Sequence, residues 1–136
     1  MTIALQYTNV TVNDVDESIA FYGGALGLEV QNDVASGGFR WVTLGSEAQP
    51  GLGIVLSVPH AGRSQADGDA LQELLTKGVL PMLVFRADDL DATFETVRAS
   101  GAEVLQEPID MGWGQRDCAF RDPSGNMVRI AQAPSS

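Results

Sequence analysis

The chain has 136 residues, of which 44% are hydrophobic, and its 18 acidic and 8 basic residues give a net charge of −10. Such an acidic chain lacks the basic surface that displaces counterions from nucleic acid, and it has no apolar stretch of the roughly 18 residues that a membrane span needs. With one cysteine and one histidine, it cannot form an intrachain disulfide framework, a cysteine-based zinc site or a two-histidine metal site.

The length is that of a single domain, so we expect one domain over residues 1–136. The N-terminal residues lack the basic segment and long apolar run of a signal peptide. A single thiol is typical of a reducing compartment. We therefore expect a cytoplasmic protein.

Residues 4–12 alternate with a period of two, which predicts a strand. Asp14 and Glu17 form a capping box for a following helix, whose apolar face consists of Val15, Ile19, Tyr22 and Leu26 and which Gly27 ends. Gly23 and Gly24 are unusual there, because each glycine costs a helix about 1 kcal/mol relative to alanine. Further strands follow to about residue 57.

Residues 58–78 form a linker with a short helix of its own. Glycine and polar residues predict a loop over residues 58–68. Asp69 is the expected N-cap and Gly78 the expected end of the helix, whose apolar face is made by Leu71, Leu74 and Leu75.

The second half of the chain repeats the first at an offset of 74 to 75 residues. Residues 12–18 correspond to 87–93, and residues 27–30 to 101–104. The second helix is expected to begin at Asp88 or Asp89 and to end at Gly101, and residues 107–115 and 122–126 are expected to form a long loop and a tight turn. The sequence thus predicts an α+β fold of two βαβββ modules, about residues 1–57 and 79–133.

The two faces of the predicted strands differ in composition. The face expected under the helices is apolar, with Val10, Val12, Ile54, Leu56, Phe85 and Ile130. The opposite face mixes polar groups with Tyr7, Val55 and Met82. Such a mixture is typical of the lining of a concave binding site, although an ordinary solvent-facing sheet is the alternative.

These patterns resemble the vicinal oxygen chelate superfamily of glyoxalases, bleomycin-resistance proteins and extradiol dioxygenases. The matching segments are residues 12–22, 26–30, 88–93, 100–103, 107–108 and 120–126. The resemblance implies two βαβββ modules whose curved mixed sheets surround a cleft, with helices on the outer faces. It also implies a homodimer.

Enzymes of this superfamily hold a divalent metal with four side chains, one from the first and one from the last strand of each module. Carried over through the repeat, those positions are Tyr7, Val55, Met82 and Arg129. Valine and methionine offer no ligand to a hard cation, and arginine brings a positive charge. A register shift by one would add only Gln6 as a ligand. We therefore expect no metal and no cofactor.

Arg129 is the most informative candidate. Its guanidinium could anchor an anion or a carbonyl group, or it could form an ion pair with Asp117, and the two roles can coexist. Aromatic residues could form a ligand wall, with Trp113 in a flexible lid, or could belong to the core or a dimer interface. The candidate ligand-binding residues are Tyr7, Asn9, Phe39, Trp41, Val55, Met82, Trp113, Gln115, Asp117 and Arg129.

Two further residues, His60 and Cys118, can be explained without a catalytic role. His60 could act as a general base or lie solvated in its loop. Cys118 is expected to face the helices as a small buried apolar residue. No catalytic residue can be assigned from the sequence.

The resemblance implies a metal-free protein of the bleomycin-resistance type, which sequesters a small, partly aromatic compound and thereby contributes to antibiotic resistance. A glyoxalase-like lyase, isomerase or dioxygenase is the alternative, either metal-independent, with Arg129 stabilising negative charge, or with atypical metal ligands. A purely structural dimerisation module is a further alternative. Whether the chain catalyses a reaction stays open.

Overall fold

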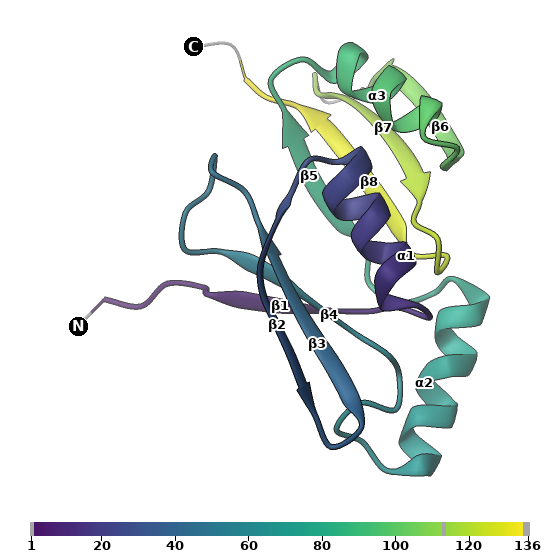
Figure 1. The fold of residues 1–136 in the computed structure, drawn as a ribbon. Helices are drawn as coiled ribbons and strands as arrows, with labels where there is room; N and C mark the ends of the chain where they lie inside the picture. Colours follow the sequence, from purple (N-terminus) through teal and green to yellow (C-terminus); the bar gives the residue numbers. More distant parts are fainter. Residues whose placement is uncertain (1, 113, 135–136) are drawn as a thin grey trace.

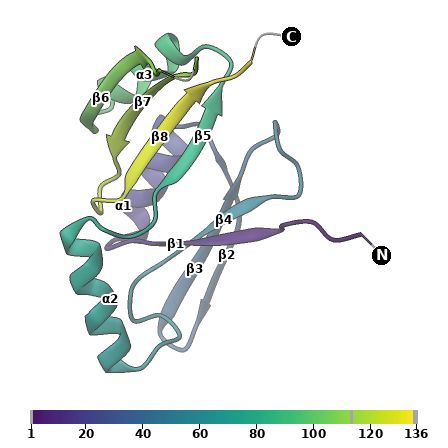
Figure 2. The same ribbon diagram turned by 180° about the vertical axis from the view of Figure 1, so that it is seen from behind.

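The computed structural model describes residues 2–112 and 114–134. Figures 1 and 2 show two four-stranded sheets, one from each half of the chain, joined by a helical linker. The first half contains β1 (Tyr7–Thr11), α1 (Val15–Ile19), η1 (Ala20–Ala25), β2 (Glu29–Ser36), β3 (Phe39–Gly45) and β4 (Gly53–Ser57). The linker contains α2 (Gln65–Lys77), and the second half contains β5 (Leu83–Ala87), α3 (Leu90–Ala99), β6 (Glu103–Asp110), β7 (Arg116–Arg121) and β8 (Met127–Gln132).

The two halves have the same topology. The strand orders are β1-β4-β3-β2 and β5-β8-β7-β6, and in each sheet the first pair is parallel while the other pairs are antiparallel. The register shifts between Val30 and Asn32 in β2 and between Val104 and Gln106 in β6, so even this irregularity recurs. The predicted α+β fold of two βαβββ modules is confirmed.

The first helix is shorter and less regular than its apolar pattern predicts. Asp14 caps it by accepting a hydrogen bond from the Glu17 amide, but after Ile19 the chain continues as the π-helix η1, in which the Leu26 amide bonds the Phe21 carbonyl. A Cβ at Gly23 would lie in van der Waals contact with the Leu28 carbonyl oxygen at 3.4 Å, so the packing there does not by itself require a glycine. Gly27, at φ 79°, ends the helix as expected.

A single hydrophobic core connects the two modules. The buried Tyr22 hydroxyl of η1 donates to Asp122 Oδ2 at 2.7 Å, and the Tyr22 ring lies 6.5 Å from that of Phe85 in β5. Asn126 in the same turn donates to the Thr11 carbonyl of β1. Both ribbon views accordingly place the first helix beside the second sheet (Figures 1 and 2).

Two boundary predictions are wrong. Helix α2 begins one turn earlier than expected, because Ser64 rather than Asp69 is its N-cap and accepts a hydrogen bond from the Asp67 amide. Strand β6 extends to Asp110 by pairing with β7, which shortens the loop predicted over residues 107–115. The caps at Asp89, Gly78 and Gly101 agree with the sequence pattern.

In residues 2–112 and 114–134, none of the helices is long and apolar enough to cross a bilayer.

Candidate functional site

The face of the first sheet opposite its buried side carries the predicted aromatic wall. Asn9, Val55 and Thr43 are register partners across β1, β4 and β3. Trp41 lies two residues from Thr43 and so on the same side. The Phe39 and Trp41 rings are 6.5 Å apart in an edge-to-face arrangement. Tyr7 is half-exposed, so this face is open in the single chain.

The corresponding face of the second sheet carries the charged candidates. Arg129 on β8 pairs with Val84 on β5 and Ala119 on β7. Val84 is 63% exposed and Met82, just before β5, is also largely exposed. Asp117 lies on β7 two residues before Ala119, hence on the same side. This face therefore combines exposed apolar side chains with one ion pair.

Arg129 is held by a hydrogen-bonded cluster. Its Nε donates to Asp117 Oδ2 at 3.0 Å, and its Nη2 donates to Asp117 Oδ1 at 3.3 Å and to Gln106 Oε1 at 3.0 Å. Gln106 Nε2 in turn donates to Asp117 Oδ1 at 2.8 Å. The predicted ion pair is thus present, with Gln106 as a third member.

The cluster has a defined charge. Burial alone raises the pKa of Asp117, but hydrogen bonds from Arg129 and Gln106 and the charge of Arg129 outweigh burial and hold this pKa below its usual value. Asp117 is therefore ionised at neutral pH. Its negative charge compensates the positive charge of Arg129, and the pair as a whole is neutral.

Gln106 is a site residue that the sequence pattern misses. Simple alternation along β6 places it on the same side as Val104, which pairs with the buried Phe120. The bulge between Val104 and Gln106 turns the Gln106 side chain to the opposite face of the sheet. Gln106 therefore pairs with Ala119 and reaches Arg129. The repeat aligns Gln106 with Asn32, which follows the corresponding shift in β2, but the sequence reveals neither shift.

The four positions that resemble metal-ligand positions do not fit a divalent cation. Tyr7 and Val55 lie on β1 and β4, Met82 precedes β5, and Arg129 lies on β8. Val55 has no donor atom, and Arg129 presents N–H groups that Asp117 and Gln106 already orient. Among the described residues, no group of three or more histidine, cysteine, aspartate or glutamate side chains is placed to hold a metal.

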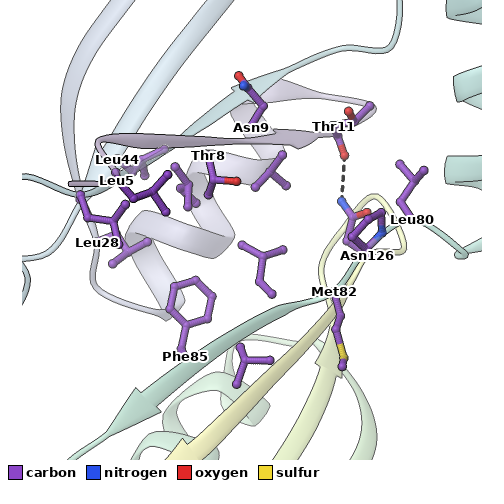
Figure 3. A pocket seen from close by; sticks show the side chains of 18 of the residues that line it. Leu5, Thr8, Asn9, Thr11, Leu28, Leu44, Leu80, Met82, Phe85 and Asn126 are labelled. Carbon is purple, nitrogen blue, oxygen red and sulfur yellow. Dashed lines mark hydrogen bonds between the residues drawn. The ribbon is translucent and has the colours of Figure 1, made fainter. Parts of the chain in front are cut away.

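A cavity lies at the open edges of β1 and β5, and Asn9, Met82 and Val84 of the two open faces contribute to its lining. It has a volume of about 490 Å³ and a mainly apolar lining that includes Leu5, Leu28, Leu44, Leu80 and Phe85. Figure 3 shows Thr8 and Asn9 on opposite sides of β1, with Thr8 on the side of Phe85. The main part of this cavity therefore lies on the Thr8 side of β1, opposite the face that carries the aromatic wall.

The predicted ligand residues are divided among several places. Asn9 and Met82 contribute to the 490 Å³ cavity, and Gln115 lines another pocket beside Arg86 and Ala131. Six candidates line neither of these pockets and lie on the two open sheet faces, namely Tyr7, Phe39, Trp41, Val55, Asp117 and Arg129. The predicted lid residue Trp113 lies outside the described residues.

His60 and Cys118 have local roles. His60 Nε2 is 2.8 Å from Asp69 Oδ1, and Gln65 Nε2 donates to the same oxygen, so the histidine ties its loop to α2 instead of lying free in solvent. Cys118 is fully buried as predicted. Burial, with a smaller contribution from Asp117, raises the pKa of its thiol to about 11, which makes it a poor nucleophile at neutral pH.

The chain is similar to known proteins over nearly its whole length. The family model described as Glyoxalase/Bleomycin resistance protein/Dioxygenase superfamily matches residues 4–130. The chain belongs to this superfamily. Because the superfamily contains both binding proteins and enzymes, membership alone leaves the function of the site open.

Three relatives cover nearly the whole chain. The crystal structure of UcmS2 has 31% sequence identity and a TM-score of 0.85, with 96% of this chain and 98% of that chain covered. TnmS3, an antibiotic-binding protein from Streptomyces sp. CB03234, has 25% identity and a TM-score of 0.76, with coverages of 98% and 99%. A protein named as a probable lactoylglutathione lyase from Vibrio cholerae is 28% identical, with coverages of 93% and 88%.

Proposed function

We propose that this protein binds and sequesters a small, partly aromatic molecule without a metal ion, as an antibiotic-binding protein does. The observation that carries the proposal is the replacement of the metal-ligand positions by an apolar and aromatic wall on one sheet and a clamped arginine on the other. An apolar lining with a few oriented polar groups is typical of small-molecule sites. The similarity to TnmS3 supports the antibiotic class of ligand.

The proposed site is completed by a second copy of the chain. Trp41 and Arg129 lie on different sheets, and neither lines the 490 Å³ cavity. Both faces carry exposed apolar side chains, including Tyr7, Met82 and Val84. Strands β1 and β5 each have one edge without a partner strand in the described chain. A homodimer that brings the aromatic face of one copy to the arginine face of the other would cover these surfaces.

The test is ligand binding by the purified protein at neutral pH. A panel of aromatic natural-product antibiotics is screened for compounds that raise the unfolding temperature, followed by mass spectrometry of the recovered compound. A true ligand at one hundred times its Kd stabilises the folded state by about 2.7 kcal/mol and is recovered unchanged. Trp41→Leu should weaken binding roughly tenfold by removing an aromatic contact, whereas Leu74→Ala, on the exposed side of α2, should not. A panel without any stabilising compound would contradict the proposal.

The second candidate is a glyoxalase-like lyase, which the Vibrio cholerae relative favours. To test it, the protein is incubated with glutathione and methylglyoxal, which combine to a hemithioacetal, alone and with added Ni²⁺ or Zn²⁺. Formation of lactoylglutathione, the favoured direction of this equilibrium, or stoichiometric uptake of either metal, would support the lyase and contradict metal-free sequestration.

A further inference from the structure

Arg129 offers one nitrogen to a ligand. Its Nε and Nη2 are engaged by Asp117 and Gln106, whereas among the described residues the polar contact of Nη1 is to the thioether of Met127, at 3.9 Å. A thioether is a weak acceptor, so displacing it costs little. The Arg129 side chain is 22% exposed on the open face of the second sheet. A bound molecule can therefore reach the Nη1 hydrogens.

The charge around this nitrogen determines which acceptor it favours. The Asp117 carboxylate, 11% exposed and 3.0 Å from Arg129 Nε, compensates the guanidinium charge. A second anion brought to Nη1 would be repelled by Asp117 and would lose its hydration. The net charge of −10 opposes an anion at longer range as well. A neutral carbonyl oxygen accepts the same hydrogen bond without these costs.

Arg86 and Arg121 are further cations on this side of the sheet. Arg121 on β7 forms an ion pair with Glu103 and donates to the Gly125 carbonyl, so its charge is compensated. Arg86 lies on β5, two residues beyond the Val84 partner of Arg129, and it is exposed. It is a diagonal neighbour of Arg129 across two paired strands and so lies within the Debye length, but it is surrounded by water of high dielectric constant, in which two unit charges interact only weakly. Arg86 therefore does little to restore an attraction for anions at Arg129.

On the basis of the proposed function, we propose that the site is specific for aromatic ligands with a neutral carbonyl oxygen, which accepts a hydrogen bond from Arg129 Nη1. Asp117 sets this preference by neutralising the arginine, and Gln106 is a positioning residue that leaves Nη1 as the free donor. Anionic analogues of the same shape bind more weakly.

Three naphthalenes of similar shape test this specificity by isothermal titration calorimetry at pH 7. 2-Acetylnaphthalene has a neutral carbonyl group, 2-naphthoate has an anionic acceptor, and 2-ethylnaphthalene has no acceptor. We expect the ketone to bind roughly tenfold more tightly than either analogue. Arg129→Met should make the ketone and the hydrocarbon equal, while Arg86→Gln should leave the order unchanged.

Asp117→Asn provides the sharpest test, because it keeps an acceptor for Arg129 but removes the compensating charge. In this variant the affinity for 2-naphthoate should rise roughly tenfold, while that for the ketone changes little. Circular dichroism establishes that each variant is folded. If Asp117→Asn is unstable, Gln106→Leu, which leaves Asp117 in place, is the second test and should reduce the preference for the ketone.

The outcomes separate this inference from the proposed function. Tighter binding of 2-naphthoate than of the ketone by the unmodified protein would overturn the carbonyl specificity and leave aromatic binding intact. Equal binding of the ketone and the hydrocarbon would do the same. A protein that binds none of the three compounds would contradict binding of small aromatic molecules itself, and the inference with it.

Discussion

At the scale of single residues, the buried hydrogen bond between Tyr22 and Asp122 connects the modules. Asp122 also accepts bonds from the amides of Ser124 and Asn126 and from the Asn126 side chain. Burial, reinforced by the Asp122 charge, raises the pKa of Tyr22 far above its usual value, so its hydroxyl stays protonated and donates. Tyr22→Phe removes one donor from a buried carboxylate and should lower the free energy of unfolding by about 1.5–3 kcal/mol, as measured by urea denaturation.

The other tyrosine supplies the matched control. Tyr7 is half-exposed on β1, so Tyr7→Phe should change the unfolding free energy by less than about 0.5 kcal/mol. Equal effects of the two substitutions would show that the Tyr22 hydroxyl does not join the modules.

The residues of the candidate site were only partly predictable. The repeat placed Asp117 and Arg129 on neighbouring strands and one face, and their ion pair follows from that placement. Gln106 was not predicted as a site residue because strand alternation assumes a regular pleat. A bulge inserts one residue, so the side chains after it point to the opposite faces of the sheet. No local propensity in the sequence marks this bulge.

At the scale of elements, helix α2 contains Gly68, at which the neighbouring His60 ring leaves no room for a side chain. Gly68 is buried against the His60 ring, and a Cβ there would overlap that ring. Alanine usually stabilises a helix by about 1 kcal/mol relative to glycine. Gly68→Ala should instead destabilise the protein, because His60 must leave and loses its bond to Asp69. Thermal unfolding measures whether the substitution lowers the stability of the protein instead of raising it.

Two comparisons define the Gly68 result. Gly24→Ala in η1, where an added Cβ meets no atom within 4 Å, should be neutral or stabilising. In a His60→Ala background, Gly68→Ala should stabilise, because the ring is gone. A Gly68→Ala protein more stable than the unmodified chain would contradict the packing described for His60.

The start of α2 also shows why element boundaries are hard to predict. Ser64 and Asp69 are both good N-cap residues, and the apolar positions Leu71, Leu74 and Leu75 fit a helix from either one. The choice of Ser64 leaves Asp69 inside the helix, where it bonds His60 and Gln65. These tertiary contacts are not visible in a periodicity.

At the scale of the whole molecule, the proposed homodimer predicts a response to charge on the open face. Val84→Glu removes little packing within one chain, because Val84 is 63% exposed. A buried and unpaired carboxylate in an interface is costly, so the variant should be monomeric at concentrations where the unmodified protein is dimeric. Analytical ultracentrifugation over a dilution series gives the dissociation constant.

Val79→Glu is the matched control, since Val79 is 61% exposed but lies in the connection between α2 and β5, outside the strands of both sheets. It should leave the dissociation constant unchanged. An unmodified protein that stays monomeric at all concentrations would contradict the shared site.

The repeat was sufficient to predict two modules with one topology, because a duplicated hydrophobic pattern specifies the same supersecondary unit twice. The way the modules meet was not predictable. It depends on Tyr22, Asp122 and Asn126, which contact residues far away in the sequence. The 490 Å³ cavity between β1 and β5 follows from this arrangement and has no counterpart in either module alone.

The clamped guanidinium of Arg129 also bears on how strongly the site can bind. A free arginine side chain gives up roughly 1.5–2 kcal/mol of rotamer entropy when it becomes ordered. Here its bonds to Asp117 and Gln106 order it in the folded protein, before any ligand arrives. A ligand that accepts from Nη1 therefore meets a donor already in position, and the free energy gained from that bond is little reduced by the entropic cost of immobilising the side chain.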